Sequence, residues 1–408
     1  MDLISDNKSN QNTQVHVIFY TDVHGRFLSE KTSETSKQSA GIDRLSTYAK
    51  QVRKRNKNVL IIDNGDSIQG TPLVDLHDFT APSLKTLNHP LNIVHDKIGV
   101  NCFIVGNHEF NFGMKQIDSI RKKSRVAWLG ANVYSRQSDK CYFEPYRIFD
   151  YVSIRIGVLG LVTEYVSRWE SGAHISGLEF KNAVETCGAL INKIREECDF
   201  LIVAYHGGLK RNPENNERWA VVDNNENQGL ELWNLYPEID LLLTGHQHRS
   251  LLFEPDGDKA IVIQASCYGK QWAHIVVEKK DKPVLNQKLL IHSELIDALR
   301  YESDPEIRVS MAPHLEHCEN ILNTILGTVD ESFLINDPMN DVWLKKHPLI
   351  QWINDLMCKI TGVDISGIPL LDANLKGFSG EVKIREILEN FIFQDNVCIL
   401  EINGIILR

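Results

Sequence analysis

The chain contains five runs of apolar, β-favouring residues, and each run ends at a short cluster of polar residues. The five runs span residues 15–20, 59–62, 102–105, 201–204 and 239–243. Only His16 and Asp240 interrupt them, which is typical of strands that are buried on both faces. Segments of helical periodicity alternate with these runs, and two further strand-like runs occupy residues 154–161 and 260–264. The pattern predicts one α/β catalytic domain over residues 15–300.

The polar clusters stand at equivalent places, directly after the predicted strands. They are Asp22-Val23-His24, Gly65-Asp66, Gly106-Asn107-His108-Glu109, His206-Gly207-Gly208 and Gly245-His246-Gln247-His248. In α/β sheets, the loops that leave the carboxyl ends of the strands line the ligand crevice. A lone Asp at a strand end is more often a turn residue than a ligand. Because five clusters recur at this position, we expect them to converge on one site.

The side chains of these clusters are those that hold two divalent metal ions. One carboxylate must bridge two dications about 3.5 to 4 Å apart, and Asp66, in its tight Gly65-Asp66 turn, is the best candidate. Asp22 and His24 are two residues apart on an extended segment, so they point the same way and can bind the first ion. His248 would complete that site.

Asn107, His206 and His246 would bind the second ion together with the bridging carboxylate. The ligand set suits Mn, Zn or Fe. A hydroxide shared between the ions would then be the nucleophile, because metal binding lowers the pKa of water from about 15.7 towards about 7. His108 follows the ligand Asn107 directly, and it could protonate the departing alkoxide or stabilise charge on the phosphoryl oxygens. His108 and Asn107 are therefore the predicted catalytic residues.

The five clusters, in this order, resemble the calcineurin-like metallophosphoesterase superfamily. Residues 63–73 and 106–113 resemble the family of 2',3'-cyclic-nucleotide 2'-phosphodiesterases and 5'-nucleotidases more closely, and the resemblance covers roughly residues 15–408. It implies an α/β fold with a two-sheet sandwich flanked by helices, two metal ions on the ligands named above, and a small-molecule nucleotide substrate. It also implies that His108 is the catalytic histidine that binds no metal.

The residue that orients His108 departs from the pattern of many 5'-nucleotidases. Where those enzymes have an Asp, this chain has Asn111, as the cyclic-phosphodiesterase branch does. An amide can hold the imidazole ring by a hydrogen bond but brings no charge to it, which predicts a weaker general acid. The substitution is also a hint that the substrate is a cyclic diester.

The C-terminal third predicts smaller elements. Residues 304–327 predict one helix with a kink at Pro313 that links two domains, residues 328–338 look extended, and residues 348–360 and 382–390 predict helices. Residues 397–407 resemble a strand that is cut short. The predicted domains are a polar tail over residues 1–14, the catalytic domain, a linker helix over 301–327 and a shortened α/β C-terminal domain over 328–408. In that last domain, residues 371–377 stand where nucleotidases of the family have a Gly-rich segment with arginine.

Composition and charge exclude several other classes of protein. Apolar residues make up 42% and charged residues 24%, as in ordinary globular proteins. The formal charge of −10 argues against stable nucleic-acid binding, and no run of residues is long and apolar enough to predict a membrane span. The polar N-terminus does not resemble a secretory signal, and the eight cysteines form no C-x-x-C pair, so we expect reduced cysteines and a cytoplasmic location. The oligomeric state is left open.

Two alternatives to an active nucleotide hydrolase remain. The chain could be a truncated, catalytically weak remnant that binds metal or a partner surface without turning nucleotides over. Exposure of the apolar residues around 399–407 would favour that interpretation. A nuclease-like member of the superfamily is the other alternative, and the absence of an evident basic groove in the sequence weighs against it.

Overall fold

The computed structural model describes residues 14–29, 40–77, 84, 86–222, 224–257, 259–284, 287–368, 375–391 and 397–403. The chain divides into two compact units, Met1–Ala312 and Pro313–Arg408. The candidate site lies entirely within the first unit. In the described part of the chain, no helix combines the length and the apolar character that crossing a membrane requires.

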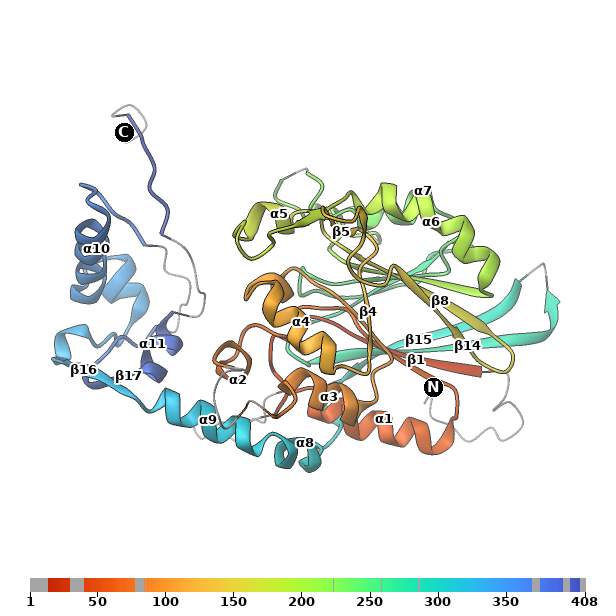
Figure 1. Cartoon of the computed structure of the whole chain (residues 1–408), viewed down its shortest axis with the longest axis horizontal. Coiled ribbons are helices and arrows are strands. Elements are labelled where there is room, and N and C mark those ends of the chain that lie inside the picture. Colours follow the sequence, from red (N-terminus) through yellow and green to blue (C-terminus); the bar gives the residue numbers. More distant parts are fainter. Residues whose placement is uncertain are drawn as a thin grey trace. The chain divides into compact units, whose positions relative to one another are not determined.

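Two six-stranded sheets packed face to face form the first unit (Figure 1). The first sheet has the order β15-β14-β1-β2-β3-β4, in which β1 to β4 are parallel and β14 and β15 are antiparallel to their neighbours. Its strands are β1 (Gln14–Tyr20), β2 (Val59–Asp63), β3 (Cys102–Ile104), β4 (Ala127–Leu129), β14 (Gln271–Val284) and β15 (Gln287–Asp297).

The second sheet has the order β12-β13-β11-β10-β8-β7, with its four central strands parallel. Its strands are β7 (Tyr146–Asp150), β8 (Arg155–Val162), β10 (Phe200–His206), β11 (Leu241–Thr244), β12 (Ser250–Phe253) and β13 (Ile261–Ala265). A small three-stranded sheet joins β5 (Val133–Ser135), β6 (Lys140–Cys141) and β9 (Leu178–Phe180).

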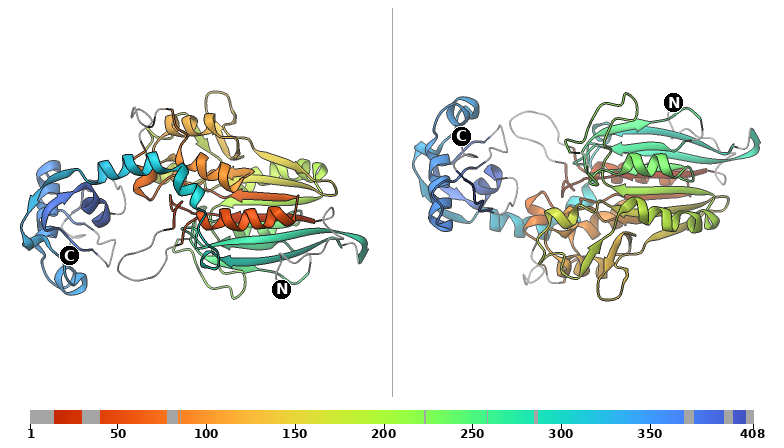
Figure 2. Two further views of the ribbon diagram at one scale, coloured as in Figure 1. Left: turned by 90° about the horizontal axis from the view of Figure 1, so that it is seen from below. Right: turned by 90° about the horizontal axis from the view of Figure 1, so that it is seen from above.

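Helices cover the outer faces of both sheets (Figure 2). Helices α1 (Asp43–Arg55) and α3 (Pro90–Ile98) lie against the first sheet, and α6 (Ala183–Glu197) and α7 (Gly229–Leu235) lie against the second. The remaining helical segments of this unit are α2 (Pro72–Asp75), η1 (His108–Phe110), α4 (Met114–Lys123), α5 (Val166–Trp169), η2 (Ala298–Arg300) and α8 (Pro305–Ser310). The predicted fold, a two-sheet α/β sandwich flanked by helices, is confirmed.

Burial on both faces explains the nearly continuous apolar runs. Along β10, Phe200 and Ile202 lie in the core between the two sheets, whereas Leu201 and Val203 lie in a second core beneath α6 and α7. Successive strand residues point to opposite faces, so both sets must be apolar. All seven predicted strand runs overlap a strand of the structure, with ends that differ by no more than two residues.

The second unit has a small core of its own. Its elements are α9 (Ala312–Leu322), β16 (Ile325–Val329), η3 (Glu331–Phe333), a π-helical turn η4 (Met339–Trp343), α10 (Pro348–Thr361), β17 (Gly380–Lys383) and α11 (Ile384–Asn390). Strands β16 and β17 pair antiparallel. The core contains Ile335, Leu349, Leu375, Phe378 and Val382. The predicted helix over residues 348–360 corresponds to α10.

The single helix predicted over residues 304–327 is correct in part. Residues 305–322 are helical, with an interruption at Met311, two residues before Pro313, where a disturbance of the helix was expected, and the helical part ends at Leu322. Ile325 and Leu326 have helical spacing but lie in β16, because pairing with β17 overrides the local pattern. For the same reason the helix predicted over 382–390 begins only at Ile384.

Two further predictions concern the end of the chain. The strand predicted over 397–407 is not a strand in its described part, residues 397–403. Residues 404–407 lie outside the described residues. The segment compared with the Gly-rich nucleotidase segment is described only from residue 375 onwards.

Candidate metal centre

The five polar clusters converge at the carboxyl ends of parallel strands. Each predicted site residue either ends such a strand or follows it within a few positions. Asp22 and His24 follow β1, Asp66 follows β2, Asn107 and His108 follow β3, His206 ends β10, and His246 and His248 follow β11. Because the two sheets pack face to face, these strand ends lie at one edge of the sandwich. The structure thus brings together residues from five separate parts of the chain.

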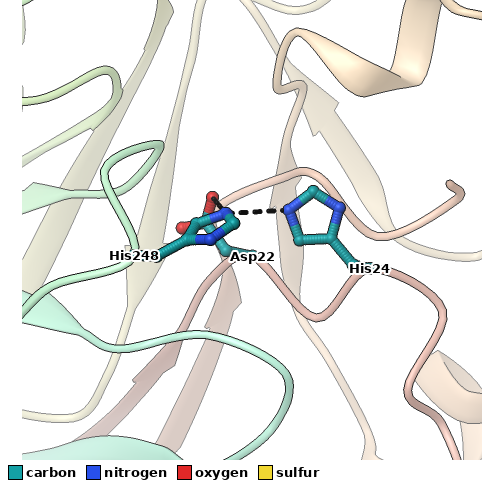
Figure 3. A group of neighbouring side chains, drawn as sticks. All are labelled: Asp22, His24 and His248. Atoms are coloured by element: carbon teal, nitrogen blue, oxygen red, sulfur yellow. Dashed lines mark hydrogen bonds and ion pairs between the residues drawn. The ribbon is translucent and has the colours of Figure 1, made fainter. Parts of the chain in front are cut away.

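Asp22, His24 and His248 form the first group (Figure 3). One potential ligand atom from each lies within 4.8 Å of the others. The Nε2 atom of His248 lies 3.5 Å from Asp22 Oδ1 and 3.0 Å from His24 Nε2. Two imidazole nitrogens that face each other beside a carboxylate are arranged as ligands around a common point.

Asp66, His206 and His246 form the second group, also within 4.8 Å of one another. His206 Nε2 lies 3.0 Å from Asp66 Oδ2, and Asn107 Oδ1 lies 2.9 Å from His246 Nδ1. The two groups adjoin, because His206 Nε2 is also 4.0 Å from Asp22 Oδ1 in the first group. Asp66, which we expect to bridge two ions, also adjoins the first group, since its backbone carbonyl oxygen accepts a hydrogen bond from the N–H of His24 at 2.8 Å.

Burial controls the charge state of the first group. It raises the pKa of the Asp22 carboxyl to about 7. It lowers the pKa of His24 and of His248 to about 4, so both imidazoles are neutral near pH 7. Neutral imidazole is the form that binds metal, and a nearby dication would stabilise the ionised form of Asp22.

In the second group, His206 and Asp66 form a buried pair. Burial alone would lower the pKa of His206, but the charge of Asp66 and the hydrogen bond to it raise that pKa to about 10. Burial opposes ionisation of Asp66 too, yet the neighbouring imidazoles of His206 and His108 hold its pKa well below the usual range. A metal cation would compete with the proton that this pair holds.

The donor atoms fit a pair of borderline dications. His206 gives its Nδ1–H to the carbonyl oxygen of Asn64, so its Nε2 faces Asp66. That buried Nε2 atom has Asp66 Oδ2 as its partner at 3.0 Å. Carboxylate oxygens, one amide oxygen and imidazole nitrogens form a set that suits Mn, Zn or Fe.

Five of the predicted metal ligands adopt a backbone conformation that is uncommon outside glycine. Asp22, His24, Asp66, His246 and His248 have φ angles of 52°, 49°, 55°, 69° and 57°. Asp and His enter this left-handed region more readily than most residues, but each such residue still costs about 1 kcal/mol or more. Strain of this kind concentrates at functional sites, where it directs side chains that regular strands would turn elsewhere.

Glu109 holds two of these loops together, a role that the sequence did not reveal. Its side chain is fully buried, and it accepts hydrogen bonds from the backbone N–H groups of Asp66, Ser67 and Gly106 at 2.8, 2.8 and 2.6 Å. Burial and the Asp66 charge raise the pKa of Glu109 to about 7, and these N–H groups oppose the rise. The loops after β2 and β3 thus share one acceptor.

Gly106 is required by close packing within the site. A Cβ atom there would contact Asp66 Oδ1 and would lie 2.8 Å from His206 Cε1. Any side chain at this position would displace two candidate ligands.

His108 lies beside the two groups and faces a cavity. Its backbone N–H donates to Asp66 Oδ1 at 2.8 Å, and its Nδ1 lies 2.7 Å from Asn111 Oδ1. The cavity has a volume of about 250 Å³ and is lined by Asn107, His108, Asn111, Val166, Trp169, Glu170 and His246. Trp169 stacks on His246, with ring centroids 5.3 Å apart. The contact between Nδ1 of His108 and Oδ1 of Asn111 means that this amide holds the His108 ring, as we expected.

The family model for calcineurin-like phosphoesterases matches residues 15–250, which is more than half of the chain. The chain belongs to the calcineurin-like phosphoesterase family. The family resemblance inferred from the five clusters is thereby confirmed.

Individual relatives are identical to this chain at about a quarter of the matched residues. A 5'-nucleotidase from Vibrio cholerae is 27% identical over 242 residues, which cover 58% of this chain and 41% of that protein. A 2',3'-cyclic-nucleotide 2'-phosphodiesterase/3'-nucleotidase from Salmonella typhimurium is 26% identical over 259 residues, covering 60% and 38%. The chain thus spans about two fifths of the length of these relatives. A crystal structure of a putative 5'-nucleotidase from Staphylococcus aureus has the same fold, with a TM-score of 0.81 at 23% identity over 93% of this chain and 72% of that one.

Sequence reasoning missed three residues around this calcineurin-like site besides Glu109. Glu226 Oε1 lies 3.2 Å from His246 Nε2, Trp169 packs on the same ring, and Glu170 contacts Asn111. None of them belongs to a polar cluster at a strand end. Only their position in the folded chain identifies them.

Proposed function

We propose that this calcineurin-like phosphoesterase is a dinuclear-metal-dependent hydrolase of nucleotide phosphoesters. The observation that carries the proposal is the pair of adjoining ligand groups, with His206 Nε2 3.0 Å from Asp66 and 4.0 Å from Asp22. Asp22, His24, Asp66 and His248 would bind one ion. Asp66, Asn107, His206 and His246 would bind the other.

When bound, the two ions would polarise the phosphoryl group and lower the pKa of water so that hydroxide forms near neutral pH. The protein's own residues prepare the rest of the reaction. Burial keeps His24 and His248 neutral, and Glu109 fixes the loops that carry Asp66 and Asn107. His108 supplies a proton to the departing alkoxide from Nε2, since its Nδ1 is held by Asn111.

The substrate that we favour is a 2',3'-cyclic nucleotide. One support is Asn111, which stands where many 5'-nucleotidases have an Asp. The other is the relative named a 2',3'-cyclic-nucleotide 2'-phosphodiesterase/3'-nucleotidase. A nucleoside 5'-monophosphate is the other substrate class, supported by the relative named a 5'-nucleotidase. We propose a cytoplasmic location, which the five buried thiols Cys102, Cys187, Cys198, Cys267 and Cys318 support.

One observation favours a second function, binding of a partner without turnover. Ile399, Leu400 and Ile402 are 64%, 78% and 45% exposed. Exposed apolar residues of this size can form an interaction surface. In this alternative the protein associates through these residues and hydrolyses no nucleotide.

A metal-reconstituted assay tests the proposal. The full chain, loaded with Mn, Zn or Fe, is given 2',3'-cyclic AMP, 5'-AMP and bis(4-nitrophenyl) phosphate in parallel. We expect metal-dependent turnover of at least one nucleotide, and loss of that turnover in Asp66→Asn with the fold intact. The control is Asp96→Asn on the exposed face of α3, which makes the same chemical change away from the site. Equal activity of Asp66→Asn and wild type would contradict the proposal, and metal binding without any turnover would favour the alternative.

A further inference from the structure

Glu170, directly after α5, lies behind the residue that holds His108. Its Oε2 accepts a hydrogen bond from Asn111 Nδ2 at 2.7 Å. Its Oε1 lies 2.7 Å from His174 Nδ1 and accepts from the backbone N–H of Ser171 at 2.8 Å. The Glu170 side chain is only 9% exposed, so three neighbours hold its carboxylate in one place.

The chemistry of this carboxylate determines which way the Asn111 amide faces. An ionised carboxylate only accepts hydrogen bonds, so the NH₂ group of Asn111 must face Glu170. The carbonyl oxygen of Asn111 therefore faces His108, and Nδ1 of His108 must carry the hydrogen between them. Without Glu170, the amide could rotate by half a turn and present its NH₂ group to the ring, which would force the opposite tautomer.

We infer that Glu170 is a positioning residue for catalysis, acting on His108 through the Asn111 amide. It selects the tautomer with hydrogen on Nδ1, so that Nε2 is the nitrogen available to the leaving group. The inference rests on the proposed hydrolase function. Glu170 also supplies a negative charge that Asn111 does not carry, although this charge lies one side chain further from the His108 ring.

Two facts place this chain of contacts at the reaction site. Asn111 and Glu170 line the same cavity of about 250 Å³ as His108. The backbone N–H of His108 donates to Asp66, which anchors the other end of the histidine to the metal groups. The contact of Nδ1 with Asn111 opposes rotation of the His108 ring, which also packs against the His24 ring with centroids 5.2 Å apart.

Leaving-group dependence distinguishes positioning from a general structural role. Hydrolysis of 2',3'-cyclic AMP releases an alkoxide that needs a proton, whereas bis(4-nitrophenyl) phosphate releases a phenolate that leaves without one. We expect Glu170→Gln to lower kcat for 2',3'-cyclic AMP by about 10- to 100-fold, with little change in KM, because proton donation contributes about 10²- to 10⁴-fold. Turnover of the nitrophenyl diester should change by less than about twofold. The matched control is Glu196→Gln on the exposed face of α6.

A double variant that exchanges the amide and the carboxylate should restore the activity lost in Glu170→Gln. In Asn111→Asp combined with Glu170→Gln, the new carboxylate accepts from His108 and the new amide donates to that carboxylate, so every hydrogen bond is kept. We expect this double variant to recover most of the activity on 2',3'-cyclic AMP. It also provides the test if Glu170→Gln alone does not fold, as judged by circular dichroism.

A spectroscopic measurement needs no turnover. Long-range ¹H–¹⁵N NMR of histidine-labelled, metal-free protein should show hydrogen on Nδ1 of His108 in wild type and a population with hydrogen on Nε2 alone in Glu170→Gln. Equal losses on both diesters, no loss on either, or an unchanged tautomer would overturn the inference. If the wild type hydrolyses neither 2',3'-cyclic AMP nor 5'-AMP, the proposed function fails, and the NMR experiment still decides whether Glu170 sets the tautomer.

Discussion

The buried carboxylate of Glu109 accepts a hydrogen bond of 2.8 Å from the backbone N–H of Asp66. The same carboxylate accepts from the N–H of Gly106, which belongs to the following strand's loop. Two loops that carry candidate metal ligands are therefore fixed by one side chain that binds neither ion. The positions of Asp66 and Asn107 depend on it.

Replacing Glu109 with Gln should destabilise the protein. One carboxylate oxygen becomes an NH₂ group that cannot accept, so at least two buried backbone N–H groups lose their acceptor, at about 1–3 kcal/mol for each. Urea unfolding of the metal-free protein measures the loss, with Glu196→Gln on the surface of α6 as the control. An unfolding free energy equal to that of wild type would show that the loops hold their positions without Glu109.

Replacing His248 with Ala should remove one of two bound metals. His248 Nε2 lies 3.5 Å from Asp22 Oδ1, and without it the first ion would keep only Asp22, His24 and the shared Asp66. We expect the metal content per chain, measured by mass spectrometry after dialysis, to fall from two ions to one. His292→Ala, an exposed histidine on β15, should keep both. Retention of two ions by His248→Ala would exclude His248 as a ligand.

Replacing Glu226 with Ala should weaken the second metal site. Glu226 accepts from His246 Nε2 at 3.2 Å, which leaves His246 Nδ1 facing Asn107, and the hydrogen bond to His246 lowers the pKa of Glu226. Loss of such a partner behind a metal-binding histidine typically weakens metal affinity by about 10- to 100-fold. Calorimetric titration with Mn measures the change. Glu226→Gln, whose amide oxygen can still accept from His246, should lose less of the affinity for Mn. Glu214→Ala on an exposed loop should leave that affinity unchanged.

The stability of the metal-free protein should fall in acid because of a buried histidine pair. The Nδ1 atom of His274 lies 2.6 Å from the Tyr48 hydroxyl, and its Nε2 lies 2.9 Å from Nδ1 of His16. Burial lowers the pKa of His274 to about 3 and that of His16 to about 4. The unfolded chain binds protons at these groups from about pH 6.5, whereas the folded chain does not, so stability is complete above about pH 6.5 and is lost as the pH falls.

For His274 alone, the loss between pH 7 and pH 5 is on the order of 2 kcal/mol. Urea unfolding at the two pH values measures it. His274→Gln should show a smaller pH dependence than wild type, although it is less stable at pH 7. The same dependence in both proteins would mean that other groups cause the acid sensitivity.

Much of the first unit could be predicted from local pattern. The runs 15–20 and 201–204 correspond to β1 and β10 because strands buried on both faces must be apolar at every position. The convergence of Asp22 and Asp66 followed from one rule, that parallel strands end at the same edge of a sheet. That His206 joins them depends in addition on the packing of the second sheet against the first. The second unit was harder to predict: Ile325 and Leu326 keep helical spacing in sequence but lie in β16, where Ile325 pairs with Lys383 of β17.

The sequence by itself determined which strands form and which polar side chains stand at their ends, since both depend on neighbours along the chain. Only the tertiary structure decided which atoms behind those side chains hold them. The contacts of Glu109 with Asp66, and of Glu170 with Asn111, join residues 43 and 59 positions apart. Hydrogen bonds between distant loops depend on how two sheets pack, and no local periodicity records that packing.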